Sequence, residues 1–217
     1  IFWVEPEARA ILPLDGFHLS KSLRKTLRSD KYEVTADQAF HRVITLCAES
    51  AQDRPTTWIN GDIEEAFLRL HQNGLAHSVE VWSSEGGKRR LVGGLYGLAL
   101  GRAFFGESMF SRMTDASKIA MAWLVARLRV GQFSLLDCQF MTSHLASLGA
   151  IEVSAEDYSV LLGEALAEGG VALSGSFSAL DAFDALPEEA RAPFSATLTV
   201  SGPVSGQVIA QLLTHTS

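Results

Sequence analysis

A glycine-rich apolar stretch from Gly93 to Arg112 constrains the fold most strongly. It holds five glycines between Gly93 and Gly106, among residues that otherwise favour β-strands. Glycine inside an apolar strand costs stability and usually marks a bulge or the close approach of another backbone or a ligand. A turn at Leu100-Gly101-Arg102 then predicts a hairpin of two strands. The second strand carries Glu107 beside aromatic walls, either as a functional carboxylate or as the partner of an arginine in the sheet core.

Further alternating and amphipathic patterns predict an α+β protein, with a mixed, mostly antiparallel sheet and helices on both faces. Thr35 and Gln38 resemble a capping box, which predicts a helix from there to about Glu49. We expect residues 1–168 to form the main domain and residues 169–217 a divergent C-terminal segment, a loop plus two strands. One further expected helix starts at residue 20, and the others span 61–73, 114–130, 143–148 and 154–168. The other expected strands span 9–13, 32–34, 77–82, 133–139, 195–200 and 207–213.

The composition limits the classes of protein to which the chain can belong. The 217 residues are 47% hydrophobic and 20% charged, enough for a substantial core and unlike a disordered chain. The longest apolar run, residues 119–126, is well short of the about 18 residues that a membrane span needs, so we expect a soluble protein without membrane contact. Cys47 and Cys138 are too few for a disulfide framework and lack zinc-site spacing, which favours the reducing cytoplasm and no metal. Because the first residue is Ile1 and not Met, we expect an N-terminal region to precede it.

Charge is unevenly distributed along the chain. A formal charge of −7 argues against nonspecific nucleic-acid binding by the whole surface. One expected helix nevertheless places Lys21, Arg24, Lys25 and Arg28 on a single face. This basic stripe is either a solvated face or a site for phosphates.

A second polar feature lies on the expected strand 133–139. Leu135, Asp137 and Gln139 point to one side of this strand, and Leu136 and Cys138 point to the other. Two polar groups therefore share one face of an otherwise apolar strand, where we expect the chemistry together with Glu107.

The order of elements resembles the GNAT-type acyltransferase fold. Acyl-CoA enzymes of that type bind pyrophosphate with a glycine-rich loop at a helix start. The matching segment, residues 110–116, contains no glycine, which disfavours coenzyme A.

Several motifs narrow the resemblance to one family. They are Thr57-Trp58-Ile59, His77-Ser78-Val79-Glu80-Val81-Trp82, Leu91-Val92-Gly93-Gly94-Leu95-Tyr96-Gly97, Phe105-Gly106-Glu107-Ser108-Met109-Phe110-Ser111-Arg112, Asp115-Ala116-Ser117-Lys118, Asp137-Cys138-Gln139 and His144-Leu145-Ala146-Ser147-Leu148-Gly149-Ala150. With them the chain, from about Trp3 to Tyr158, resembles bacterial leucyl/phenylalanyl-tRNA–protein transferases. Beyond about Glu168 it departs from the usual short C-terminus of that family.

The resemblance implies an aminoacyltransferase, a leucyltransferase that works without a cofactor. Such an enzyme transfers leucine or phenylalanine, and methionine to a lesser extent, from aminoacyl-tRNA to proteins with N-terminal arginine or lysine, marking them for degradation. We expect a cytoplasmic monomer. Its expected catalytic residues are Asp137, Gln139 and Glu107, its expected aminoacyl pocket comprises Trp58, Leu95, Phe104, Leu124, Leu128, Leu136 and Trp3, and tRNA phosphates are the expected ligand of Lys21, Arg24, Lys25 and Arg28.

Three alternatives stay open at this point. An acyl-CoA acyltransferase would need the missing pyrophosphate loop. A transferase acting on peptidoglycan precursors would share fold and donor, but is expected to be longer and to carry a helical arm. A module of another class would hold tRNA without catalysing a reaction.

Overall fold

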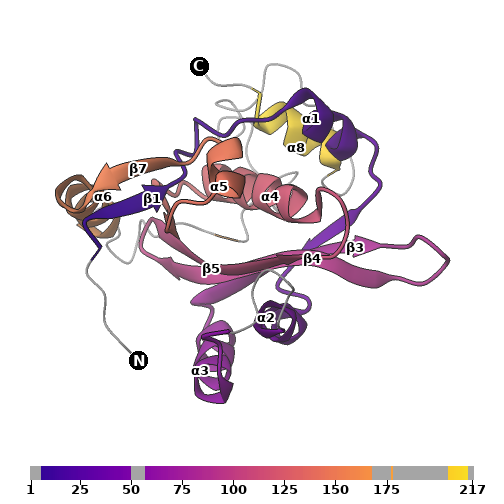
Figure 1. The fold of residues 1–217 in the computed structure, drawn as a ribbon, viewed down its shortest axis with the longest axis horizontal. Coiled ribbons are helices and arrows are strands. Elements are labelled where there is room, and N and C mark those ends of the chain that lie inside the picture. Colours follow the sequence, from indigo (N-terminus) through magenta and orange to yellow (C-terminus); the bar gives the residue numbers. More distant parts are fainter. Residues whose placement is uncertain (1–5, 50–56, 168–176, 178–204, 215–217) are drawn as a thin grey trace.

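The computed structural model describes residues 6–49, 57–167, 177 and 205–214. These residues build a seven-stranded sheet in the order β2-β3-β4-β5-β6-β1-β7 (Figure 1). Neighbouring strands are antiparallel except β5 and β6, which are parallel. The strands are β1 (Ala8–Ile11), β2 (Glu33–Ala36), β3 (Ala76–Ser83), β4 (Arg90–Leu100), β5 (Ala103–Ser111), β6 (Leu135–Gln139) and β7 (Ile151–Ser154). The prediction of a mixed, mostly antiparallel sheet is confirmed.

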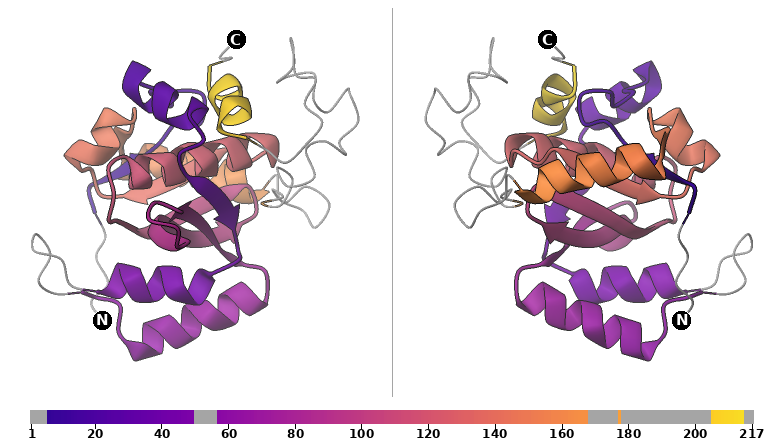
Figure 2. Two further views of the ribbon diagram at one scale, coloured as in Figure 1. Left: turned by 90° about the vertical axis from the view of Figure 1, so that its right-hand side faces the viewer. Right: turned by 90° about the vertical axis from the view of Figure 1, so that its left-hand side faces the viewer.

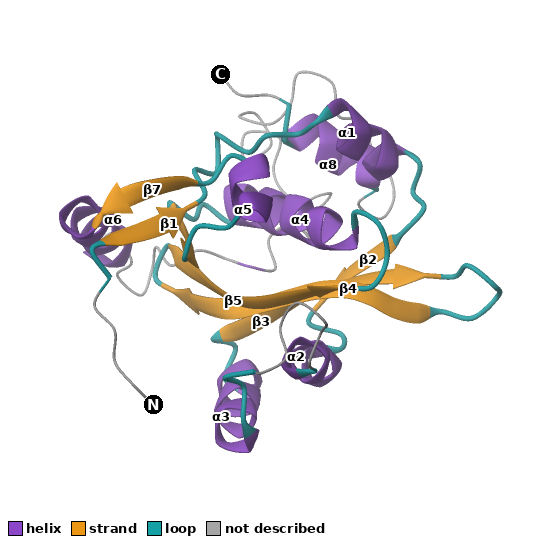
Figure 3. Ribbon diagram, in the orientation of Figure 1, coloured by secondary structure: helices purple, strands orange, loops and turns teal. Residues whose placement is uncertain are grey.

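Helices cover both faces of this sheet, as the sequence predicts (Figure 2). One face carries the central helix α4, and the opposite face carries α2 and α3 (Figure 3). The helices are α1 (Lys21–Arg28), α2 (Phe40–Ala48), α3 (Gly61–Gln72), α4 (Ala116–Val130), α5 (Ser143–Ser147), α6 (Ala155–Ala167) and α8 (Gly206–Leu212). Although α4 is buried along most of its length, the described residues include no helix that is both long and apolar enough to cross a bilayer.

The glycine-rich hairpin is formed by β4 and β5. Gly97 is required by packing, since a Cβ atom there would lie 2.2 Å from the carbonyl oxygen of Phe105. The register of the two strands shifts beside it, because Tyr96 pairs with Ser108 whereas Gly97 pairs with Gly106. Glu107 is therefore the extra residue of a β-bulge, which confirms that these glycines mark an irregular strand.

The β5 and β6 strands pair over only a short length. Their parallel pairing runs from Ala103 with Leu135 to Phe105 with Asp137. Beyond Phe105, β5 continues to Ser111 along β4, and among the described residues no strand pairs with its other edge. The two strands thus part at the residues where the sequence places its polar groups.

Two local predictions are wrong. Thr35 does not cap a helix; it lies in β2, where its hydroxyl bonds to buried Glu80 and accepts the indole N–H of Trp82, and α2 starts only at Phe40. The strand expected at 207–213 is the helix α8. Its buried residues Val208, Ile209 and Leu212 follow a helical repeat, and Ser205 caps it by accepting from the N–H of Val208. The strand expected at 195–200 lies outside the described residues.

Helix α8 packs on α1 and α4 and belongs to the main core. The N–H of Gly206 donates to a carboxylate oxygen of Asp30 at 2.9 Å, and Arg129 donates to the carbonyl oxygen of Leu212 at 2.8 Å. These contacts fix α8 to the end of α1 and to α4.

Candidate active site

A cavity of about 1080 Å³ lies where β5 and β6 part. This volume is at the upper end of the range for small-molecule sites. Its polar wall includes the bulged part of β5 and the end of β6. The lining residues are Leu46, Glu49, Trp58, Leu95, Tyr96, Gly106, Glu107, Ser108, Met109, Phe110, Ser111, Arg112, Ser117, Met121, Leu124, Leu136, Cys138, Gln139, Phe140, Thr142, His144 and Leu145.

Four of the expected pocket residues line this cavity: Trp58, Leu95, Leu124 and Leu136. The expectation for Phe104 and Leu128 is corrected, because both lie fully buried in the core and neither lines the cavity. Phe104 points to the α4 side of the sheet and packs against Phe133 and Phe177. Met109, Met121 and Leu145 are further apolar residues of the lining. Trp3 lies outside the described residues.

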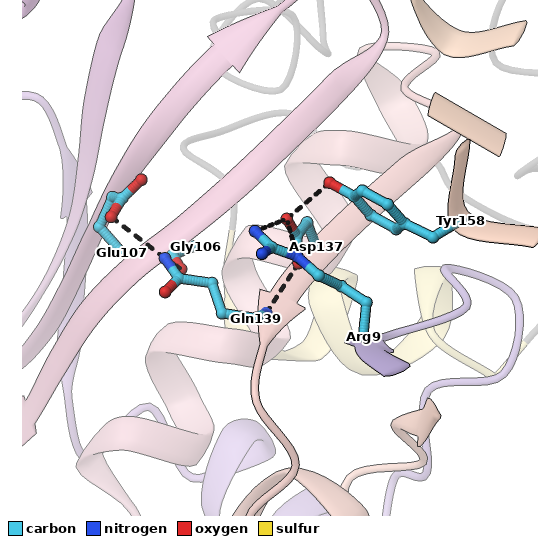
Figure 4. A network of polar contacts seen from close by, with 6 residues as sticks. All are labelled: Arg9, Gly106, Glu107, Asp137, Gln139 and Tyr158. Carbon is cyan, nitrogen blue, oxygen red and sulfur yellow. Dashed lines mark hydrogen bonds and ion pairs between the residues drawn. The ribbon is translucent and has the colours of Figure 1, made fainter. Parts of the chain in front are cut away.

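Asp137 is fully buried, and both of its carboxylate oxygens are occupied (Figure 4). Arg9 donates to Oδ2 through Nη2 at 2.7 Å, and its Nε lies 3.1 and 3.2 Å from the two oxygens. The hydroxyl of Tyr158 donates to Oδ2 at 2.8 Å, and the backbone N–H of Gln139 donates to Oδ1 at 2.7 Å. A carboxylate with this set of donors is held as a fixed anion and does not itself reach the cavity.

This network also changes the acidity of its donors. Burial, followed by the bond to Asp137, raises the pKa of Tyr158 to about 12, so its hydroxyl keeps its proton. Burial works against the charge of Arg9, but its bonds to Asp137 outweigh that effect and raise its pKa. Both donors therefore remain protonated at neutral pH.

Gln139 connects this network to the cavity. Its backbone adopts φ of 65°, a left-handed conformation that is uncommon for residues other than glycine. Its side-chain amide nitrogen lies 3.0 Å from the carbonyl oxygen of Gly106 and 3.1 Å from Oε2 of Glu107. Figure 4 shows the Gln139 side chain between Asp137 and Glu107. The three expected catalytic residues thus form one connected group.

Glu107 is the carboxylate of this group that lines the cavity. Burial raises the pKa of Glu107 above its ordinary value, and the charge of Asp137 adds to this effect, while the bond from Gln139 opposes it. Because one oxygen accepts a single hydrogen bond from Gln139, the carboxylate keeps capacity to accept protons or donors from a ligand.

Burial shifts the pKa of two further polar residues of the lining, Cys138 and His144. Burial, together with the charge of Asp137, raises the pKa of the Cys138 thiol to about 12, so a cysteine nucleophile is disfavoured. Burial and the charge of Lys118 lower the pKa of His144. Its Nε2 is a buried atom without a hydrogen-bond partner among the described residues, so a neutral imidazole faces the cavity.

Arg9, Tyr158 and His144 were not among the expected site residues. Arg9 is 128 residues from Asp137 in the chain, and no spacing rule connects them. His144 stands in one of the motifs that carry the resemblance, which was its only signal. Within the described residues, no group of three or more histidine, cysteine or acidic side chains is arranged to hold a metal ion.

The basic stripe lies on α1, as predicted. Ser20 caps this helix, Leu23 and Leu27 are buried against the core, and the four cationic residues lie on the remaining part of the helix surface. Lys21, Lys25 and Arg28 are exposed. The Nε atom of Arg24 is buried without a hydrogen-bond partner among the described residues.

Comparison with known proteins gives a consistent result. The family model described as leucyl/phenylalanyl-tRNA protein transferase matches residues 11–163. The leucyl/phenylalanyl-tRNA–protein transferase of Rhizorhabdus wittichii is 57% identical over 224 residues, covering 100% of this chain and 89% of the relative. The protein of the same name from Novosphingobium aromaticivorans is 46% identical over 240 residues, covering 100% and 88%. That from Zymomonas mobilis is 63% identical over 158 residues, covering 73% and 58%.

Proposed function

The chain belongs to the leucyl/phenylalanyl-tRNA protein transferase family, and from this premise we propose that it transfers leucine or phenylalanine from aminoacyl-tRNA to the N-terminus of acceptor proteins. The observation that carries the proposal is the cavity at the parting of β5 and β6. There, the connected pair Gln139 and Glu107 lies beside an apolar wall. Such a site can hold an apolar aminoacyl group and an amine next to each other.

In the proposed reaction, the acceptor's α-amine attacks the ester carbonyl of the aminoacyl-tRNA. A C–N bond forms, the C–O bond to the ribose of the tRNA breaks, and the proton lost by the amine balances the proton gained by the leaving ribose oxygen. Aminoacyl esters are already activated, so holding amine and ester in line supplies most of the acceleration.

We assign different roles to the two carboxylates. Glu107 faces the cavity with a raised pKa, which suits it to hold the acceptor ammonium and to take its proton. Asp137 has its oxygens occupied by Arg9, Tyr158 and Gln139, so it positions Gln139. Gln139 orients the reacting groups by hydrogen bonds, because its amide is not a usable base.

The aminoacyl side chain is proposed to lie against Leu95, Met121, Leu124 and Leu136. Discrimination by an apolar pocket amounts to only about 1–3 kcal/mol per methylene, so methionine is an expected minor substrate. Trp58 lines the same cavity and is 48% exposed, which leaves its ring free to contact the donor.

Cationic acceptors fit the charge of this site. We propose that acceptors begin with arginine or lysine, which places two positive charges close to the Glu107 carboxylate. The other acidic residue of the lining, Glu49, is paired with Arg112. Modification of such N-termini is proposed to mark the acceptors for degradation.

The basic stripe on α1 is proposed to bind phosphates of the tRNA. Three of its side chains are exposed, and they form no salt bridge among the described residues. Contacts of this kind hold the backbone and do not read the sequence.

We propose that the fold is of the GNAT type, which the parting of β5 and β6 supports, and that the protein acts as a cytoplasmic monomer. We also propose that residues 169–217 form a segment distinct from the catalytic part, although α8 packs on the main core.

The decisive experiment is transfer of labelled leucine from leucyl-tRNA to a peptide that begins with arginine. Product peptide lengthened by one leucine is the expected result, and the same peptide with an acetylated N-terminus is the control. Stable binding of tRNA without transfer would instead favour a non-catalytic tRNA-binding module. Acylation from acetyl-coenzyme A would favour the acyl-CoA alternative.

A further inference from the structure

The free edge of β5 forms a continuous wall of the cavity. Every residue from Gly106 to Arg112 lines it. On the other side of β5 the ladder with β4 is complete to Ser111, so this part of β5 is bound along one edge and open along the other, as far as the described residues show.

Backbone hydrogen-bonding groups point into the cavity from this edge. The N–H of Arg112 donates to the carbonyl oxygen of Val92 in β4 at 2.7 Å. Since successive residues of an antiparallel strand alternate in the direction of their N–H and C=O groups, Phe110 also faces β4. Met109 and Ser111 then present their N–H and C=O groups away from β4, toward the cavity.

The two ends of this edge differ. At the inner end, Gln139 closes the gap between the strands by donating to the carbonyl oxygen of Gly106, and the carboxylate of Glu107 stands next to it. At the outer end, Ser111 and Arg112 are exposed. An extended ligand with a positively charged tip therefore fits with its tip at Glu107 and its remainder directed past Arg112 to solvent.

We propose that the first residues of the acceptor polypeptide bind as an added strand along the free edge of β5, with the terminal amine at Glu107. This assignment rests on the proposed function and specifies how the second substrate is held. Because the amine lies at the inner end and the chain leaves at the outer end, the acceptor strand runs parallel to β5.

Main-chain pairing explains how acceptors with different sequences can be used. Strand addition obtains its affinity from backbone hydrogen bonds, which do not depend on side chains. Selectivity for the first residue then comes from the charge at Glu107. In a parallel pairing, only every second residue of the added strand bonds to β5.

The test is a scan of an arginine-initiated peptide in which one backbone amide at a time is N-methylated. Strand addition predicts that KM for the peptide rises roughly three- to tenfold at alternate positions. The intervening positions are matched controls, since their N–H groups point away from β5, and KM should stay unchanged there. Equal effects at successive positions, or none, would overturn the proposal.

Hydrogen exchange of the enzyme gives an independent readout on the complete chain. Adding saturating peptide should slow exchange of the Met109 and Ser111 amides at least severalfold, while the Phe110 amide, already bonded to β4, should not change. Unchanged exchange at Met109 and Ser111, or slowing by uncharged tRNA alone, would overturn the proposal. Failure of the proposed function would show itself separately, as absence of leucine transfer to the unmethylated peptide.

Discussion

The backbone N–H of Gln139, a residue whose φ is 65°, donates to Oδ1 of Asp137 at 2.7 Å. A non-glycine residue in such a conformation costs about 1–3 kcal/mol and persists only where its surroundings fix it. Asp137 fixes it here, and Arg9 and Tyr158 fix Asp137 in turn. The orientation of the Gln139 amide therefore depends on residues that do not line the cavity.

The Tyr158 hydroxyl offers a mild test of this dependence. Tyr158→Phe removes one donor to Asp137 and keeps the ring, so we expect a loss of about 1–2 kcal/mol in the free energy of unfolding and a fall in kcat of about fivefold. KM for aminoacyl-tRNA should be unchanged. Denaturant unfolding and steady-state transfer measure these quantities.

Tyr32→Phe is the matched control for this change. The Tyr32 hydroxyl donates to the carbonyl oxygen of Thr114 at 2.8 Å, away from the cavity. Its removal should also cost stability, by about 0.5–1.5 kcal/mol, and leave kcat at the parent value. Equal kcat values in the two variants would contradict a positioning role for Tyr158.

Substitutions in the ion pair of Arg9 and Asp137 allow effects on stability to be distinguished from effects on activity. Asp137 is 0% and Arg9 25% exposed, so Arg9→Met should destabilise by about 3 kcal/mol, because it leaves a buried carboxylate without its charge partner. The double variant Arg9→Met with Asp137→Leu should recover most of that loss. It should nevertheless remain inactive, because Gln139 has lost the acceptor of its N–H. Recovery of transfer along with stability would refute the assigned role of Asp137.

The raised pKa of Glu107 predicts how acceptor binding depends on pH. Its pKa lies above the ordinary value of 4.5 because of burial, and the peptide α-amine, with a pKa of about 7.7–8.0, is fully charged in acid. As the pH is lowered, protonation of Glu107 should therefore weaken peptide binding. This loss should begin at a higher pH than it would for an ordinary carboxylate. Calorimetric titrations between about pH 4 and 7 measure this, and Glu107→Gln should give weak binding without that dependence.

The same shift carries a stability consequence. A carboxyl group whose pKa is raised by folding stabilises the protein fully below its unfolded pKa, and this contribution is lost as pH rises through the folded value. Glu107→Gln is neutral at every pH, so its stability relative to the parent should increase over that window. A variant less stable than the parent at pH 7 would argue against burial as the cause of the shift.

Two buried leucines offer a test of the proposed aminoacyl pocket. Leu95 is 2% exposed and lines the cavity, whereas Leu128 is 0% exposed and does not. Both changes to alanine should cost about 2–5 kcal/mol of stability. Only Leu95→Ala should shift competition between leucyl- and phenylalanyl-tRNA, by about tenfold toward the larger phenylalanine. A similar shift in Leu128→Ala would mean that global loosening sets the preference.

The basic stripe predicts a salt dependence. Lys21→Ala with Lys25→Ala removes two exposed cations of α1 and should flatten the slope of log affinity against log salt by about 1.4–1.8, at about 0.7–0.9 per phosphate contact. Leucyl- and phenylalanyl-tRNA should be affected alike. Arg69→Ala on α3, which removes an exposed cation paired with Glu65, is the control and should keep the parent slope. If the double variant also keeps it, the stripe is a solvated face.

Local patterns predicted much of this structure. Each of three features follows from a pattern within a few neighbouring residues: the hairpin, the stripe on α1 and the polar strand β6. The structure contains all three. Glu107 and Gln139 carried a signal because polar groups are unusual in apolar strands. The glycines also predicted an irregular strand. They did not predict the position of the bulge, because that position depends on how Tyr96 and Ser108 pair.

Features that depend on tertiary packing were not predictable. Arg9 and Tyr158 meet Asp137 only because β1 pairs with β6 and α6 packs beside them. Phe104 and Leu128 have the composition of pocket residues, and only the placement of β5 and α4 assigns them to the core. Helix α8 was mistaken for a strand because its apolar residues are too few to distinguish a period of 2 from 3.6.

The contact of Gly206 with α1 has a consequence for truncated forms of the chain. A Cβ atom at Gly206 would lie 2.0 Å from the carbonyl oxygen of Leu27, so α8 lies directly against the helix that carries the basic stripe. The residues matched by the family model end at 163, and all the catalytic candidates lie before that point. Loss of the C-terminal residues from 205 onward would keep every reacting group and remove the support of the stripe. Under the proposed role of the stripe, such a shortened protein should bind aminoacyl-tRNA more weakly, and because α8 is part of the main core it should also be less stable.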